Sequence, residues 1–129
     1  MDVIDIQNLN HYFGQGTLKK QVLFQINLKI TAGEIVILTG PSGSGKTTLI
    51  RVLSGLLQPT NGSFYINDDT FRKINLKQYR SQIGSIIHSE TPFEGTLLEN
   101  ITFNDNTVTT EDLKWAIDGV QLSTYIKSL

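Results

Sequence analysis

One stretch of this chain, residues 40–47, constrains the fold more than any other, and it reads Gly-Pro-Ser-Gly-Ser-Gly-Lys-Thr. Its spacing of glycine, four residues, glycine, lysine and serine or threonine is typical of a loop that wraps around phosphate groups. The apolar run 35–39 before it is typical of a strand buried on both faces, and therefore of a parallel sheet. The apolar positions of residues 46–53 fit a helix packed on that sheet. The sequence therefore predicts an α/β fold with a phosphate-binding loop between strand and helix.

The residue types in this loop suit the binding of a nucleoside triphosphate with Mg²⁺. Glycines let the backbone turn tightly and bring its N–H groups close to phosphate oxygens. Lys46 adds a positive charge for the outer phosphates, and the hydroxyl of Thr47 can coordinate Mg²⁺. An ordinary loop rich in glycine and serine is the alternative, but it does not explain the strand before and the helix after. The nucleotide-binding candidates are Gly40, Pro41, Ser42, Gly43, Ser44, Gly45, Lys46, Thr47 and Thr48, with Lys46 also a catalytic candidate and Thr47 a metal ligand.

Hydrophobic periodicity predicts further elements on both sides of the loop. Phe24, Ile26, Leu28 and Ile30 alternate with polar residues, as in a half-buried strand. Thr109 with Asp112 forms a capping-box pattern at the start of a helix that Gly119 ends. The other predicted elements are strands at 3–9, 63–66 and 83–87, turns at 14–16 and 67–69, and a helix at 76–82.

Composition excludes several classes of function. The formal net charge of -1 gives no global field that would attract nucleic acid. The absence of cysteine removes disulfides and thiolate metal sites. No apolar run approaches the ~20 residues that span a bilayer, and the acidic N-terminus does not resemble an export signal. A chain of 129 residues suits one globular domain.

Several segments resemble the nucleotide-binding domain of ABC transporters (the ATP-binding cassette). Residues 33–37 before the loop and 53–62 after it resemble this family, and the part of the chain through the phosphate loop is more similar to ATP subunits of the lipoprotein-release and macrolide-export type. Residues 79–84 and 95–101 are more similar to peptide and lipid exporters, so a mosaic or engineered origin is one reading. The resemblance implies a P-loop NTPase of the α/β class. We expect an incomplete ABC-type core in which residues 1–129 comprise an N-terminal antiparallel β subdomain and the start of the helical subdomain, ending before the signature loop, the Walker B strand and the switch histidine.

The resemblance also assigns roles outside the loop. Tyr12 matches the aromatic residue that stacks on adenine, with Phe13 as a substitute, although Tyr12 could instead cover a sheet edge. His88 stands where the family has a glutamine that touches Mg²⁺ and the attacking water, which makes it a catalytic and metal candidate. An ordinary turn histidine is the alternative. Glu90 and Asp105 fit solvated loops better than catalytic bases.

The resemblance implies a transporter component that binds ATP and Mg²⁺ to energise transport, with residues 95–97 favouring export. Its expected partners are transmembrane domains and a second nucleotide-binding domain, without nucleic acid, and its expected place is the cytoplasmic face of a membrane. The family implies an ATPase, but we do not expect hydrolysis by residues 1–129 alone, because the later motifs are absent from them. The alternatives are a truncated or engineered fragment that binds nucleotide without hydrolysis, and another small P-loop enzyme such as a kinase.

Overall fold

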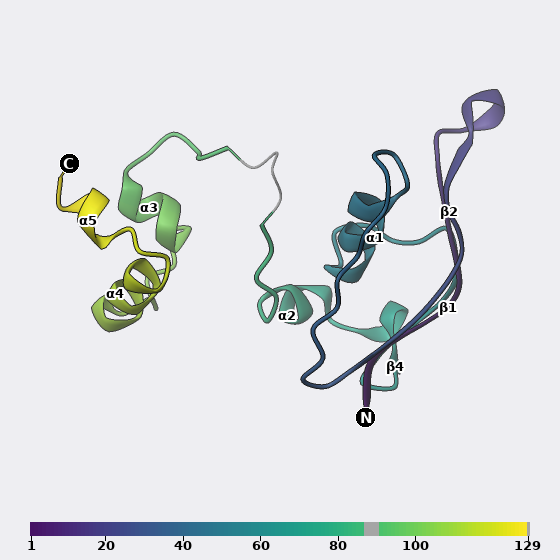
Figure 1. Cartoon of the computed structure of the whole chain (residues 1–129), viewed down its shortest axis with the longest axis horizontal. Coiled ribbons are helices and arrows are strands. Elements are labelled where there is room, and N and C mark those ends of the chain that lie inside the picture. Colours follow the sequence, from purple (N-terminus) through teal and green to yellow (C-terminus); the bar gives the residue numbers. More distant parts are fainter. Residues whose placement is uncertain (87–90, 129) are drawn as a thin grey trace. The chain divides into compact units, whose positions relative to one another are not determined.

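The computed structural model describes residues 1–86 and 91–128, in two compact units (Figure 1). The first unit is Met1–Ser85 and the second is Ile86–Leu129. The first contains a sheet and the helix that follows the phosphate loop, and the second contains helices. Over the described ranges, no helix combines the length and the apolar character needed to cross a bilayer.

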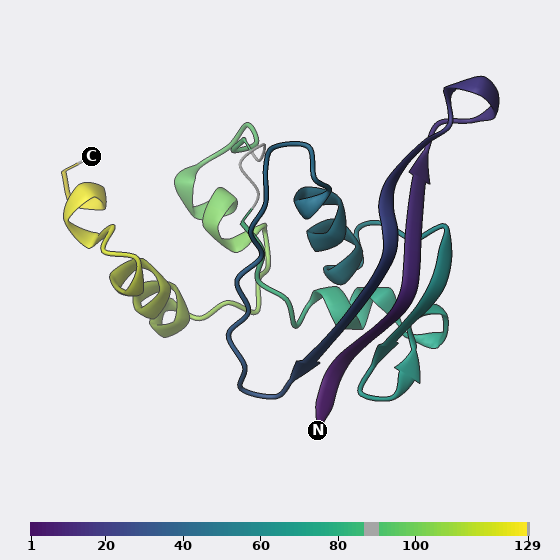
Figure 2. The same cartoon turned by 45° about the vertical axis from the view of Figure 1, so that its right-hand side comes forward.

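The first unit is built on a four-stranded antiparallel sheet with the strand order β2-β1-β3-β4. The long strands β1 and β2 form a twisted hairpin, and β3 lies along the other edge of β1 (Figure 2). This sheet agrees with the antiparallel subdomain that the sequence predicts. The strands are β1 (Asp2–Phe13), β2 (Lys20–Thr31), β3 (Asn61–Ile66) and β4 (Asp69–Thr70), and the 3-10 helix η1 (Gly16–Leu18) lies in the turn of the hairpin.

Register shifts in the hairpin change which residues face the core. Leu9 pairs with Ile26, whereas His11 pairs with Leu23, so one strand carries an extra residue between these pairs. Gln25 has a φ of 46° there, and its N–H donates to the side chain of Asn10 rather than to the ladder. The prediction that Phe24 shares a face with Ile26 is therefore wrong, and Leu23 is the buried residue instead.

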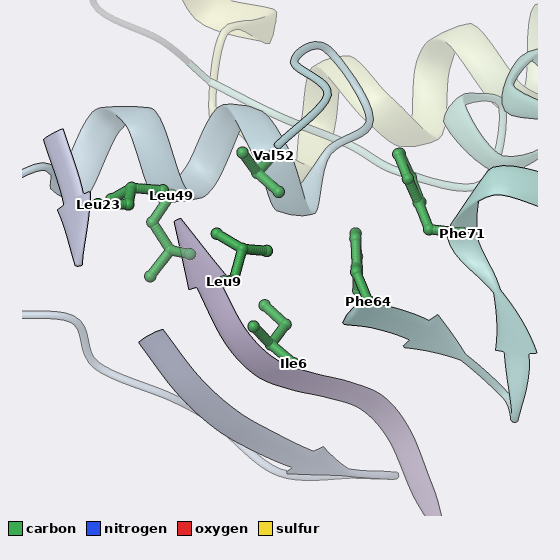
Figure 3. Close-up of a cluster of buried hydrophobic side chains, with 7 residues drawn as sticks. All are labelled: Ile6, Leu9, Leu23, Leu49, Val52, Phe64 and Phe71. Atoms are coloured by element: carbon green, nitrogen blue, oxygen red, sulfur yellow. The ribbon is translucent and has the colours of Figure 1, made fainter. Parts of the chain in front are cut away.

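The core lies between the sheet and α1 (Lys46–Leu53), the helix that follows the loop. Figure 3 shows Leu49 and Val52 of this helix pointing toward the side chains of β1. Phe71, in the 3-10 helix η2 (Phe71–Lys73), stacks on Phe64 with ring centroids 4.6 Å apart. Burial of such side chains stabilises the fold by about 1.5–3 kcal/mol each. The core residues are Ile6, Leu9, Leu23, Leu49, Val52, Phe64 and Phe71.

Two predicted strands, and the parallel sheet they imply, are not formed by the described residues. Residues 35–39 have no regular secondary structure, and the side chains of Ile35 and Ile37 are 91% and 82% exposed. Residues 83–86 likewise form no strand, while residue 87 lies outside the described ranges. A strand needs hydrogen-bonding neighbours from elsewhere in the chain. The four strands described above do not pair with residues 35–39 or 83–86.

Within residues 91–128, the second unit contains three short helices, α3 (Leu97–Thr102), α4 (Thr110–Gly119) and α5 (Ser123–Ile126). The predicted capping box is present at α4, where the Thr109 hydroxyl accepts from the Asp112 N–H and the Asp112 carboxylate accepts from the Thr109 N–H. Thr96 and Glu99 make the same pair at α3. Each box satisfies N–H groups that a helix leaves free at its start.

These bonds give a pH dependence that can be measured at Asp112. The Thr109 hydroxyl, and then its backbone N–H, hold the pKa of the Asp112 carboxyl below its usual range. A lowered pKa in the folded state contributes stability above the unfolded pKa, and this contribution is lost as the pH falls below about 4. We expect Thr109→Val to raise the Asp112 pKa toward its ordinary value in an NMR titration. Thr110→Val, one position later, is the matched control, and an equal shift in both variants would contradict the assignment.

Candidate functional site

The phosphate loop contains a tight turn that depends on glycine. Ser44 N–H donates to the Pro41 carbonyl at 3.3 Å, which closes a four-residue turn. Gly43 is the third residue of that turn and has a φ of 79°, the positive value that a type II turn requires at this position. The loop therefore bends back on itself just before α1 begins.

Gly45 brings the start of α1 against the sheet. Its φ of 95° lies in the left-handed region, and a Cβ atom here would lie 2.9 Å from the carbonyl oxygen of Val22 and 3.0 Å from a methyl group of Leu23. Both neighbours belong to β2. The absence of a side chain at Gly45 thus allows close contact between the loop and β2, and we expect this contact to fix the position of the loop.

The start of α1 offers hydrogen-bond donors without a competing acid. Gly45 is the N-cap residue and supplies no side-chain acceptor, and the first turn carries no acidic residue. The N–H groups of the first turn have no partner within the helix, and the helix dipole adds partial positive charge at this end. Thr47 is exposed and Thr48 is half-buried, so the Thr47 hydroxyl is accessible beside these donors.

The Lys46 side chain folds back across the loop. Its ammonium group donates to the carbonyl oxygens of Gly40 at 2.7 Å and Pro41 at 2.6 Å, and to the Ser44 hydroxyl at 3.2 Å. All three acceptors are neutral, and among the described residues no carboxylate lies within ion-pair distance of Lys46. The positive charge is therefore held inside the loop and is not neutralised by the protein.

A pocket of about 260 Å³ lies between the loop and the sheet. Leu23, Ile26 and Leu49 form its apolar wall, and Gly40 and Lys46 contribute to its loop side. A phosphate group would lose its hydration against such a wall without gaining hydrogen bonds from it. We therefore expect an anion to bind on the opposite, solvent-facing side of the loop.

Tyr12 is half-buried near the end of β1, and polar groups lie beside it. The Lys19 ammonium lies 4.5 Å from the centroid of the Tyr12 ring, and the Tyr12 N–H donates to the Thr60 hydroxyl at 3.0 Å. The cation occupies one face of the ring. Phe13, the substitute candidate, is 43% exposed and packs edge-on against His11. Stacking on adenine by Tyr12 or by Phe13 therefore stays a prediction.

Of the candidates outside the phosphate loop, only some lie in the part of the chain that the structure describes. His88, the catalytic and metal candidate, and Glu90 lie outside the described residues, so the role of His88 stays a prediction. Asp105 is exposed and accepts hydrogen bonds from the Thr107 hydroxyl and N–H, which lower the Asp105 pKa, as suits a loop carboxylate. Within the described ranges, no group of three or more His, Cys, Asp or Glu side chains could hold a metal ion. Thr47 is the metal candidate that the structure describes.

Sequence reasoning missed the buried residue His11, which precedes Tyr12. His11 is only 6% exposed, and its Nδ1 lies 3.4 Å from the Thr60 hydroxyl. Thr60 thus contacts both His11 and the backbone of Tyr12. The alternation of His11 with the apolar residues Leu9 and Phe13 was the available signal, but the partner is 49 residues away and only the fold shows it.

The sequence of this chain is similar to a known protein family and to several known proteins. The sequence model of a family described as "ABC transporter" matches residues 23–128. The chain is 38% identical over 104 residues to the ATP-dependent permease MDL1 of Candida albicans, an alignment that covers 81% of this chain and 15% of that protein. It is 44% identical over 86 residues to the chloroplastic ABC transporter B family member 29 of Arabidopsis thaliana, covering 67% and 14%.

Two further similarities cover nearly the whole chain. It is 32% identical over 126 residues to a probable ABC transporter ATP-binding/permease protein of Haemophilus influenzae, covering 98% of this chain and 22% of that protein. The structure of a bacterial Atm1-family ABC exporter with ATP bound matches with a TM-score of 0.84 at 23% identity, over 98% of this chain and 22% of that chain. This match confirms the incomplete ABC-type α/β fold. In all four comparisons, the chain spans less than a quarter of the other protein's length.

Proposed function

Because this chain belongs to the ABC transporter family, we propose that its phosphate loop binds Mg-ATP as the nucleotide-binding part of a membrane transporter. Members of this family are ATPases that couple the nucleotide to transport. Phosphoryl transfer depends mainly on positioning and on electrostatic stabilisation of the phosphates. The described residues supply the part of this machinery that holds the phosphates.

The observation that carries the proposal is the position of the Lys46 ammonium, between the Gly40 and Pro41 carbonyls at the start of α1. A triphosphate offers charged oxygens to a cation whose present partners are neutral, so binding adds an attraction between opposite charges that the carbonyl groups do not provide. The first-turn N–H groups and the helix dipole favour the same anion. Bound Mg²⁺ would neutralise phosphate charge, and the Thr47 hydroxyl is the side chain that would hold it.

A calorimetric titration of the full chain with ATP tests this proposal. We expect saturable binding with Mg²⁺, weaker binding in EDTA, and much weaker binding of AMP, which lacks the outer phosphates that Lys46 would contact. Equal binding of ATP and AMP would mean that the affinity does not come from contacts of Lys46 with the outer phosphates. A folded sample without Mg-dependent affinity for ATP would contradict the proposal. Steady-state release of phosphate, measured on the same sample, separates hydrolysis from binding alone.

We further propose that Tyr12 stacks on the adenine ring, on the face that Lys19 leaves free. Stacking of a base on an aromatic ring contributes about 1–3 kcal/mol, so Tyr12→Ala should raise the Kd for Mg-ATP about tenfold. Tyr12→Phe keeps the ring and should bind nearly as the wild type does. Phe13→Ala is the matched control for the neighbouring ring. A large loss in Phe13→Ala alone would assign the stacking to Phe13.

We also propose that the protein works with transmembrane domains and a second nucleotide-binding domain at the cytoplasmic face of a membrane, in export. The Haemophilus influenzae relative is named for both ATP-binding and permease functions, and it is longer than the matched region. The native protein should therefore be recovered in the membrane fraction of its cells, together with membrane-spanning segments. Recovery in the soluble fraction alone would contradict this part of the proposal.

A further inference from the structure

The carboxyl end of α1 is held by a neighbouring helix, α2 (Leu76–Arg80). A helix leaves its last carbonyl groups without partners in its own backbone, so each must find another donor. The Ile50 carbonyl accepts from Ser54 N–H, and the Arg51 carbonyl accepts from Leu56 N–H and Leu57 N–H. These bonds come from the turn that ends the helix itself.

The carbonyl groups of Leu53 and Gly55 depend instead on α2. The Tyr79 hydroxyl donates to the Leu53 carbonyl at 2.5 Å. The Arg80 guanidinium donates twice to the Gly55 carbonyl, from Nε at 3.0 Å and from one terminal nitrogen at 2.6 Å. Its positive charge lies at the end of α1 that carries partial negative charge, which is the favourable arrangement.

Packing brings α2 into close contact with this end of α1. Gly55 has a φ of 73°, and a Cβ atom added to it would lie 3.2 Å from the Tyr79 ring. The ring also meets Phe71 of the core edge-on, with centroids 6.3 Å apart. Partial burial raises the pKa of the Tyr79 hydroxyl, which is a protonated donor at neutral pH even at its ordinary pKa. The contact is thus a packed interface as well as a set of hydrogen bonds.

The opposite end of α1 is the phosphate loop. Eight residues make a rod of about 12 Å, and its amino end is fixed where Gly45 meets Val22 and Leu23. Loss of the donors from α2 would weaken the hold on the carboxyl end, and α1 could then tilt about that fixed point within the limits set by the core packing of Leu49 and Val52. A tilt of α1 would change the direction of its first-turn N–H groups and would move the Lys46 side chain. These donors would then no longer point at the same anion as the loop.

We propose that Tyr79 and Arg80 are positioning residues for the phosphate loop, acting through the carboxyl end of α1 on the affinity for Mg-ATP. The inference rests on the proposed function. Mutations that act through a connected structural network have modest effects on a distant site, so we expect the combined Tyr79→Phe and Arg80→Gln variant to raise the Kd for Mg-ATP about 3- to 10-fold. Arg80→Lys keeps the charge and should recover part of the affinity.

The test measures the Kd at a temperature well below the unfolding midpoint of each variant, with the folded state verified by circular dichroism. A purely structural contact would lower the midpoint and leave the Kd unchanged. Hydrogen exchange at the amides of α1 gives a second readout, and faster exchange in the first turn is expected in the variants. The matched controls are Tyr65→Phe, which alters another half-buried tyrosine, and Arg72→Gln, which alters an exposed arginine.

The outcomes distinguish the two proposals. If the wild type binds Mg-ATP and the combined variant binds equally well, the positioning role is wrong and the proposed function stands. If the wild type has no affinity for Mg-ATP, the proposed function fails and the positioning role fails with it. A rise in Kd shared by the Tyr65 and Arg72 controls would also overturn the inference, because the effect would then not depend on α1.

Discussion

Replacing Lys46 by alanine is expected to weaken Mg-ATP binding about 100-fold, a loss of about 2.7 kcal/mol. The ammonium is held inside the loop by the Gly40 and Pro41 carbonyls and the Ser44 hydroxyl, so little ordering is needed before it meets a phosphate. Hydrogen bonds to charged groups contribute about 1.5–3 kcal/mol each, which accounts for a loss of this size. A calorimetric titration of wild type and variant measures it directly.

Two comparisons separate the charge of Lys46 from its structural role. Lys46→Met keeps most of the apolar side chain and removes the charge, so it should lose as much affinity as the alanine variant. Lys114→Ala removes a lysine from α4 in the second unit and should leave the Kd unchanged. Raising the salt concentration should weaken wild-type binding more than binding by Lys46→Met, because screening acts on the charge. Equal affinity in wild type and Lys46→Met would contradict the proposed role of the ammonium.

The sequence predicted those elements that are determined locally. The helix of α4 follows from the capping box of Thr109 and Asp112, and α1 follows from its apolar spacing, because a helix forms its hydrogen bonds within one segment. The predicted strands 35–39 and 83–87 rest on short apolar runs alone. A buried strand needs partners from distant parts of the chain, and the described strands do not pair with residues 35–39 or 83–86.

For the candidate site as well, the sequence predicts the local part and does not predict the contacts between distant residues. The loop residues follow a fixed spacing, so their positions could be read directly from the sequence. The contacts between Lys19 and Tyr12, and between Thr60 and His11, depend on how β1 pairs and on how the chain returns after α1. The shift that buries Leu23 in place of Phe24 arises from an extra residue at Gln25, which simple alternation does not reveal. These contacts and the burial of Leu23 therefore depend on pairing between distant parts of the chain, which the sequence pattern does not reveal.

Gly45→Ala is expected to destabilise the first unit by about 3 kcal/mol, much more than the same substitution at Gly43. Both glycines have a positive φ, so alanine at either position costs about 1–2 kcal/mol in backbone conformation. Only Gly45 also faces the sheet, where the new methyl group would lie 2.9 Å from the Val22 carbonyl oxygen. Nothing lies within 4 Å of the corresponding position at Gly43. A comparison of the two alanine variants therefore separates the cost of crowding against β2 from the cost of the backbone conformation.

Urea unfolding followed by the amide signals of β2 measures this difference in the unit that contains both glycines. The probe matters, because Trp115, the sole tryptophan, lies in the second unit and would not report on the loop. Equal losses in the two variants would mean that the start of α1 can move away from β2 at no cost. In that case the sheet would not fix the position of the loop. The contact of α2 with the carboxyl end of α1 could then not control the orientation of the phosphate loop. A larger loss at Gly45 supports the fixed point about which α1 would tilt.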